Sequence, residues 1–280
     1  YIGSEKNSSS LQRTTCAEEV PSHVDVQLML LPNLDTQAYE GAISKLVDKI
    51  TILEGNVQET PYLLSDNTPV IRAIIPSSSL SHYENDVAIY RIEETDFFSA
   101  DAASTGAIDL NALEIDDDIL IESLPIVTVL DSGVYFPVGL ESLVLHHWTD
   151  GVSSGGDTEH GTKVASRVAF KYICDQLPAT KVVPRARIID CNILDGSVPV
   201  NIFIKRIQAA VTAFSETSRI YNLSANAKIP IEGDEMSILG YELDALQLKR
   251  NVQFVVSAGN HNLWETETCL EDILDDDDSR

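Results

Sequence analysis

Residues 125–131, with the sequence Pro-Ile-Val-Thr-Val-Leu-Asp, constrain the fold of this chain more than any other stretch. Apolar and β-branched residues run without interruption into a carboxylate, and the turn residues Ser132-Gly133 follow directly. A continuous run of this kind is typical of a strand in a parallel sheet that is covered on both faces. Its last residue, Asp131, would stand at the carboxyl edge of the sheet, where open α/β proteins place their chemistry. Asp131 is therefore the first candidate for a functional residue.

The sequence after Pro125 alternates between strand and helix patterns. Alternation of this kind predicts an α/β fold, with a parallel sheet that carries helices on both faces. We predict strands at 126–130, 186–191, 219–223 and 252–257, and helices at 161–175, 200–215 and 234–250.

The sequence before this region has a different order. Residues 23–95 predict β-α-β-β-α-β, the split-βαβ pattern of small ferredoxin-like α+β domains, with Asp35 placed to cap the first helix. The acidic segment that follows is poor in aromatic residues and predicts a linker. We therefore divide the chain into four parts, which are a flexible arm (1–22), a ferredoxin-like domain (23–98), an acidic linker (99–124) and an α/β domain (125–280).

The composition excludes several classes of function. A formal net charge of −25 argues against binding to nucleic acid or to an anionic membrane surface, because both depend on Lys and Arg. The plainest reason for the excess acid is solubility. The chain has 4 cysteines without a C-x-x-C pair, which favours a reducing compartment. We expect a cytoplasmic protein that needs no cofactor, and a calcium loop finds no support in the spacing of the acidic residues.

Two further motifs are expected at the same edge of the sheet as Asp131. His160 stands among small residues at the mouth of a predicted helix, in Asp-Thr-Glu-His-Gly-Thr. Asn260 follows a predicted apolar strand, in Val-Val-Ser-Ala-Gly-Asn. Taken singly, each of these residues is more typical of a turn or a helix cap. Their occurrence in this order is what indicates a site.

Together the motifs resemble those of the subtilisin-like serine peptidases, the subtilases. The resemblance runs from about residue 125 to 263 and keeps the order of the family's motifs. It rests on the Asp box at 129–134, the His box at 160–165, the Ala-Gly-Asn box at 258–260, the spacers at 184–187 and 195–197, and the Asn-Leu-Ser strand at 222–224.

The resemblance implies a serine endopeptidase that cleaves proteins or peptides. Asp131 would orient the His160 ring, and His160 would act as general base and then as general acid. Asn260 would donate its amide to the oxyanion. The substrate groove would be lined by Ser224, Ala225 and Asn226. The family usually has a glycine within this last stretch, which leaves the shape of the specificity pockets open.

The chain departs from the family because no Gly-Thr-Ser box, which carries the family's nucleophile, occurs in it. We expect a fragment that is inactive alone, with the nucleophile in sequence after Arg280. The module at 23–98 resembles the subtilase propeptide, which assists folding and occludes the cleft. By analogy with intracellular subtilases, we expect a bacterial protein that acts with a regulatory protein partner.

Other interpretations stay open at this point. One is a non-catalytic subtilase-like module that binds peptides or a partner protein. Another is an aspartic peptidase, because Asp131-Ser132-Gly133 also fits that family's motif, although no second copy exists and the helices argue against it. The third is a metal site at His146-His147 with Asp150 or Asp157, which is disfavoured because adjacent histidines seldom reach one metal.

Overall fold

The computed structural model describes residues 21–100, 110–150, 157–177, 180–227 and 236–257, so the arm expected at 1–22 lies almost wholly outside the described residues. The chain divides into two compact units. The first unit comprises Tyr1–Asp96 with Ile231–Ala245, and the second comprises Phe97–Pro230 with Leu246–Arg280.

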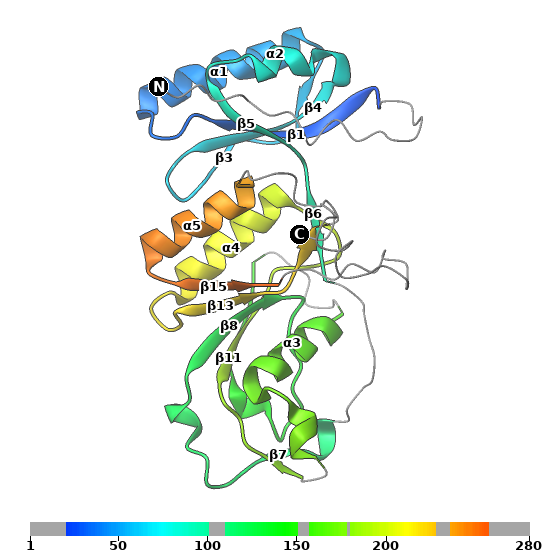
Figure 1. The fold of residues 1–280 in the computed structure, drawn as a ribbon, viewed down its shortest axis with the longest axis vertical. Coiled ribbons are helices and arrows are strands. Elements are labelled where there is room, and N and C mark those ends of the chain that lie inside the picture. The colour runs from blue at the N-terminus through cyan, green and yellow to red at the C-terminus, as the bar shows by residue number, and fades with distance from the viewer. Residues whose placement is uncertain (1–20, 101–109, 151–156, 178–179, 228–235, 258–280) are drawn as a thin grey trace, which may run out of the picture. The chain divides into compact units, whose positions relative to one another are not determined.

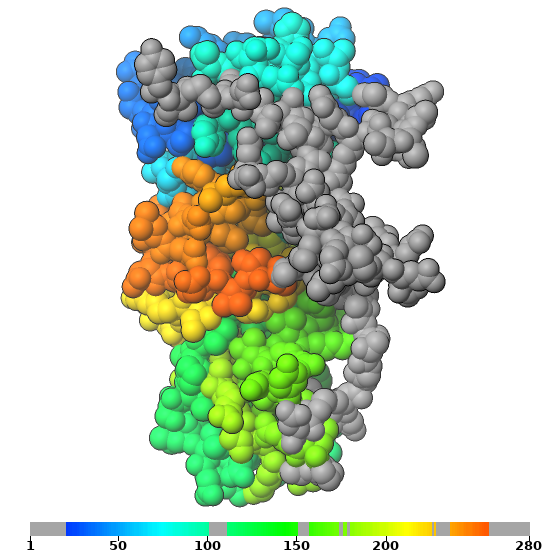
Figure 2. Space-filling view, in the orientation of Figure 1, coloured from blue at the N-terminus to red at the C-terminus, as the bar shows by residue number. Residues whose placement is uncertain are grey.

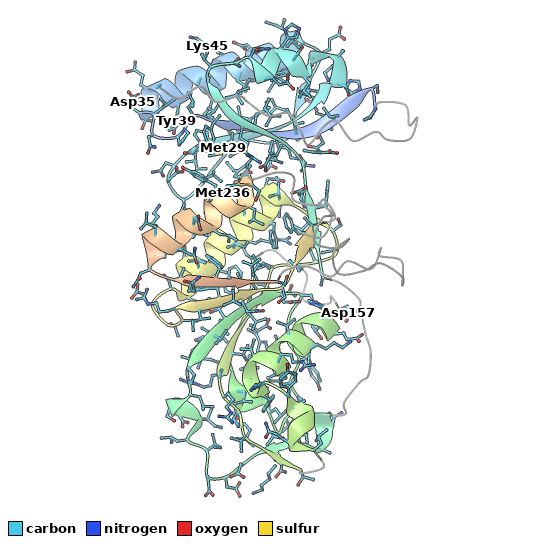
Figure 3. All side chains as sticks on the ribbon, in the orientation of Figure 1. Met29, Asp35, Tyr39, Lys45, Asp157 and Met236 are labelled. Atoms are coloured by element: carbon cyan, nitrogen blue, oxygen red, sulfur yellow. The ribbon has the colours of Figure 1, made fainter. Side chains whose placement is uncertain are left out.

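The first unit is built on an antiparallel sheet with the strand order β2-β4-β1-β5, in which β3 also pairs with β4 (Figure 1). Helix α1 begins after Asp35, whose carboxylate accepts a hydrogen bond from Ala38 N at 2.8 Å (Figure 3). Its elements are β1 (His23–Leu30), α1 (Thr36–Ile52), β2 (Asn56–Val57), β3 (Tyr62–Leu63), β4 (Pro69–Pro76), η2 (Ser77–Ser79), α2 (Leu80–Glu84) and β5 (Ile89–Glu94).

Most of these elements agree with the predicted order of strands and helices. The second strand, predicted at 57–64, is divided into β2 and β3, with Pro61 in the gap between them. The fourth strand begins at Ile89 instead of Val87, because Asp86 forms a turn by accepting a hydrogen bond from Ala88 N.

The start of helix α5 (Ile238–Arg250) also belongs to the first unit, which the sequence did not predict. Both carboxylate oxygens of Glu93 accept the Ile238 N–H group, at 3.0 and 3.1 Å. Glu242 is fully buried and accepts the Ser65 N–H group at 2.7 Å. A carboxylate at the N-terminus of a helix is stabilised by the helix dipole.

The second unit is built on a parallel sheet with the strand order β15-β13-β8-β11-β9. Helices α3 and α4 lie on opposite faces of this sheet (Figure 1), as an α/β fold requires. The elements are β8 (Ile126–Asp131), η5 (Glu141–Leu143), β9 (Val144–Thr149), α3 (Glu159–Phe170), η6 (Ile173–Gln176), β11 (Arg187–Asn192), α4 (Val200–Phe214), β13 (Ile220–Leu223) and β15 (Gln253–Val256).

The predicted strands of the parallel sheet are all present, and β9 is an addition. Strand β8 lies at the centre, as its apolar sequence requires. On the face toward α3, Val129 and Ile188 pack against Ala165 in one apolar core. The carboxyl end of β8, with Asp131, therefore adjoins a packed apolar core.

The segment predicted as a linker at 99–124 contains ordered elements in its described part. These are η3 (Leu110–Ala112), β7 (Glu114–Ile115) and η4 (Ile121–Ser123). Strand β7 pairs with β10 (Lys181–Val182), and Leu113 is buried in the core of the second unit. This part of the segment therefore belongs to the fold of the second unit.

Helix α5 buries only some of its leucines. Leu243 and Leu246 are buried, whereas Leu248 is 89% exposed. Position 248 is displaced from both by more than a third of a helical turn, so it leaves the stripe. Figure 2 shows α5, in orange, at the molecular surface. None of the described helices is long and apolar enough to cross a membrane.

Candidate active site

Asp131 and His160 form a hydrogen-bonded pair at the carboxyl edge of the parallel sheet. Asp131 is the last residue of β8 and is fully buried, while the His160 side chain, in the first turn of α3, is 22% exposed. The distance from His160 Nδ1 to Asp131 Oδ1 is 2.8 Å. A carboxylate on Nδ1 fixes the proton there and directs the lone pair of the neutral ring to Nε2. The pair can therefore act as an oriented general base.

Both the side chain and the backbone of Asp131 accept hydrogen bonds from neighbouring backbone groups. Asp131 Oδ1 accepts the Ser132 N–H group at 2.7 Å. The Asp131 carbonyl oxygen accepts the Ile193 N–H group at 2.8 Å and the Leu194 N–H group at 3.2 Å. These hydrogen bonds tie the end of β8 to the segment that follows β11. The carboxylate is thus fixed before any substrate binds.

Two glycines allow α3 to approach the turn after β8. Gly133 has φ +99°, a conformation that L side chains rarely adopt. A Cβ on Gly161 would lie 2.2 Å from the Gly133 carbonyl oxygen. The Tyr135 N–H group also donates to Thr162 Oγ1 at 2.9 Å. Gly133 and Gly161 therefore allow the close approach that brings His160 to Asp131.

The first turn of α3 is organised by Asp157, which is labelled in Figure 3. Its carboxylate accepts the Glu159 N–H group at 2.8 Å. The Thr162 N–H group donates to the Thr158 carbonyl oxygen at 2.9 Å. The helix therefore starts immediately before His160, which presents the imidazole at its mouth as the sequence predicted.

The three predicted substrate-binding residues follow β13. Ser224 Oγ donates to Asn222 Oδ1 at 3.0 Å, and Ala225 is partly exposed. Asn226 begins β14 (Asn226–Ala227), which pairs with β6 (Phe97–Ser99). Strand β6 lies between β14 and β12 (Val198–Pro199), with antiparallel pairing on both sides. The backbone of this stretch is thus already engaged by an extended segment of the same chain.

The remaining candidates are placed as follows. Asn260 lies outside the described residues. The ring of His146 stacks on Phe214 with a centroid distance of 5.6 Å, and His147 Nδ1 lies 2.8 Å from Asp190 Oδ2. The two rings therefore have separate partners. Among the residues that the structure describes, no group of three or more His, Cys, Asp or Glu side chains is arranged to hold a metal ion.

The sequence interpretation missed Asp190, in the middle of β11. Burial raises the pKa of its carboxyl, the hydrogen bond with His147 lowers it, and the charge of Asp131 raises it. The available signal was the alternation of Ile188, Asp190 and Asn192, which puts two polar side chains on one face of an otherwise apolar strand.

Comparison with protein families identifies the class of this fold and site. The model of the subtilase family, peptidase family S8, matches residues 123–277. The chain therefore belongs to the subtilase family. Subtilases are serine peptidases, hydrolases that act on proteins or peptides. A comparison with curated proteins finds no match.

Proposed function

We propose that this chain provides the base, its orienting carboxylate and the oxyanion donor of a serine-type endopeptidase. The observation that carries the proposal is the 2.8 Å hydrogen bond between buried Asp131 and His160, in a chain of the subtilase family. The aspartic peptidase alternative loses its basis, because Asp131 faces a histidine instead of a second carboxylate and stands on a parallel sheet.

In the proposed reaction, a serine hydroxyl attacks the carbonyl carbon of the scissile peptide bond. His160 Nε2 takes the hydroxyl proton, and Asp131 stabilises the resulting imidazolium. The negative charge moves to the carbonyl oxygen, where the Asn260 amide would donate a hydrogen bond. The imidazolium then gives its proton to the leaving amine, and the C–N bond breaks. Water releases the acyl group by the same proton transfers in reverse.

The serine nucleophile is a separate part of this proposal. The expectation that a Gly-Thr-Ser box follows Arg280, and that the chain is inactive without it, stays a prediction. We also propose a cytoplasmic location, no cofactor and a regulatory protein partner, on the sequence arguments given above.

Residues 23–98 are proposed to form a propeptide-like inhibitory module. Its strand order β2-β4-β1-β5 matches that of a ferredoxin-like sheet, which supports this assignment. Directly after the module, β6 pairs with β14 in the stretch proposed to bind substrate. Phe98 anchors β6 by stacking on Phe203, with ring centroids 4.4 Å apart. Residues 97–99 would therefore occupy the place of a substrate strand.

A fluorophosphonate probe, which reacts with an activated serine, tests the proposed function. The natural full-length protein should be labelled, and His160→Ala should abolish the labelling. His82→Ala, which removes an exposed histidine from α2, is the matched control and should label like the wild type. A folded wild-type protein that resists labelling would leave the non-catalytic binding module as the better interpretation.

Removal of the β6 anchor tests the inhibitory module. Phe98→Ala should speed labelling of the natural protein, because the truncated side chain loses its stack on Phe203 and holds the strand less firmly. The exposed neighbour offers a control, Phe97→Ala, which should change the rate less. Equal rates for wild type and Phe98→Ala would contradict an occluding role for β6.

A further inference from the structure

A second histidine–carboxylate pair lies beside the first one in the parallel sheet. His147 Nδ1 and Asp190 Oδ2 are 2.8 Å apart. The Asp190 side chain is 6% exposed, whereas that of His147 is 55% exposed. The pair thus joins a buried carboxylate to a histidine that is open to solvent. Nothing in the proposed reaction uses it.

The register of the strands places Asp190 close to Asp131. In the pairing of β11 with β8, Asp190 stands opposite Val129. Side chains alternate along a strand, so Asp131 points to the same face as Val129. Asp190 and Asp131 are therefore diagonal neighbours on adjacent strands, on the face that α3 covers. The electrostatic effect of Asp131 on Asp190 agrees with this placement.

Asp190 also reaches the turn that follows Asp131. The Val134 N–H group is near enough to its carboxylate to lower the pKa of Asp190. Gly133 in the same turn makes the close contact with Gly161, next to His160. Asp190 thus lies beside the turn that brings Asp131 and His160 together.

We propose that Asp190, held by His147, is a positioning residue that strengthens His160 as a base through its buried negative charge beside Asp131. This inference rests on the proposed function of the Asp131–His160 pair. A second carboxylate behind Asp131 favours the imidazolium, because charges in a buried site are weakly screened. The 2.8 Å contact with His147 favours the charged form of Asp190.

The titratable groups that face Asp190 come from the two strands that flank β11. Asp131 faces Asp190 from β8, and His147 faces it from β9. On α3, the nearest charged neighbours of His160 in sequence are Glu159 and Lys163, which form an exposed ion pair at 2.6 Å. Since that pair is neutral as a unit, Asp131 and Asp190 dominate the charge on this face.

Titration of His160 by NMR in the 280-residue chain tests the proposal, with His160→Gln used to assign its signal. Asp190→Asn keeps the size of the side chain and removes the charge, and should lower the midpoint of the His160 titration by about half a pH unit or more. Asp190→Ser removes the same charge with a smaller polar side chain and should lower the midpoint in the same direction. Glu141→Gln removes one exposed charge and should leave the midpoint unchanged.

An unchanged midpoint in either folded variant, Asp190→Asn or Asp190→Ser, would overturn the proposal. Asp190→Ser keeps the test valid if Asp190→Asn does not fold. The titration needs neither a nucleophile nor turnover. Failure of the probe to label the natural protein would therefore refute the peptidase proposal separately, whatever the His160 titration shows.

Discussion

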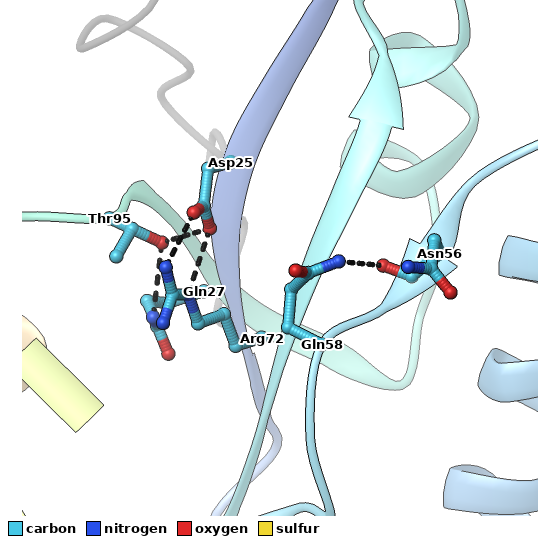
Figure 4. Close-up of polar contacts among 6 residues, drawn as sticks. All are labelled: Asp25, Gln27, Asn56, Gln58, Arg72 and Thr95. Atoms are coloured by element: carbon cyan, nitrogen blue, oxygen red, sulfur yellow. Dashed lines mark hydrogen bonds and ion pairs between the residues drawn. The ribbon is translucent and has the colours of Figure 1, made fainter. Parts of the chain in front are cut away.

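The two five-stranded sheets of this protein each carry buried or half-buried polar side chains. These side chains find their hydrogen-bond partners in different ways. In the first unit, Asp25 receives two hydrogen bonds from Arg72, at 3.1 and 2.7 Å, and one from Thr95 at 2.6 Å (Figure 4). Gln27 donates to Thr95 and accepts from Tyr62. The carboxylate thus has a cation and a hydroxyl as partners. This is what a structural network requires.

In the second unit, several buried oxygens around the candidate site lack a hydrogen-bond partner. Asp131 Oδ2, Asp190 Oδ1 and Asn192 Oδ1 are buried and accept no hydrogen bond from any residue that the structure describes. Asp190 adds a further carboxylate. In the part of the chain that the structure describes, Asp131 is hydrogen-bonded to the imidazole of His160, and Asp190 to that of His147. The comparison teaches that a network closed by arginine stabilises a fold, whereas a carboxylate surplus beside histidine is suited to moving protons.

The strongest test of this difference removes the charge of Asp131. In the natural protein, Asp131→Asn should slow fluorophosphonate labelling about 10⁴-fold, because the amide favours the wrong His160 tautomer while the geometry is kept. Labelling rates at neutral pH measure the effect. Asp25→Asn is the matched change in the first unit and should leave the rate within a few-fold of the wild type. A loss below tenfold for Asp131→Asn would contradict its assigned role.

The close approach of α3 to the turn after β8 can be broken at Gly161. Gly161→Ala should lower the free energy of unfolding by about 3 kcal/mol, because the new Cβ would clash with the Gly133 carbonyl oxygen. Urea denaturation measures this. Gly41→Ala is the control, since Gly41 lies in helix α1 with no atom within 4 Å of an added Cβ. It should be neutral or slightly stabilising, and equal effects at the two glycines would refute the close contact.

The structural network of the first unit should respond in stability alone. Arg72→Met should lower the free energy of unfolding by about 2–3 kcal/mol, since Asp25 would be left without its cation. Arg219→Met, which breaks a long and exposed ion pair with Glu216 and a hydrogen bond to the Arg250 carbonyl oxygen, should cost about 1 kcal/mol or less. Denaturation followed by circular dichroism distinguishes them. The midpoint of the His160 titration should be unchanged in Arg72→Met. A shifted midpoint would contradict the assignment of this network to stability alone.

Asp96 is the carboxylate of the first unit that departs from this pattern. Burial, with Glu93 and Glu94 nearby, raises the pKa of Asp96 from 3.8 to about 7. Between these values the folded state holds more protons than the unfolded state, so the wild type loses stability as the pH rises from 4 to 7. Asp96→Asn lacks this loss and should be more stable than the wild type at pH 8 by about 1–2 kcal/mol. Urea denaturation at pH 4 and pH 8 measures the difference, which should vanish or reverse at pH 4.

Much of the second unit could be predicted from its sequence, because its strands are apolar and its helices periodic. Strand β8 was predicted within one residue of its observed end. Strand β9, with the sequence Val-Leu-His-His-Trp-Thr, has no comparable pattern and forms because β11 offers it an edge. Strand β6 is likewise held by its partners on both sides. Elements whose stability comes from pairing leave little trace in local sequence.

The candidate site was predictable in part for the same reason. Asp131 and His160 each stand at the end of an element, within two residues of a glycine, where motifs are visible in the sequence. Asp190 stands inside a strand, and its significance depends on the register with β8 and β9. Register is set by tertiary pairing, which the sequence of one strand does not contain.

The central place of β6 in its three-stranded sheet has a kinetic consequence. Any other extended peptide that takes the place of β6 beside β14 must first displace Phe97–Ser99, a competitor that is covalently attached. A tethered strand acts at an effective concentration that reaches the millimolar range for short connections. Occupancy by a free peptide is then set by how often the tethered strand leaves, so binding becomes slower and weaker without any change in the groove itself. Cutting the chain near this strand would convert a permanent competitor into one that dilution removes.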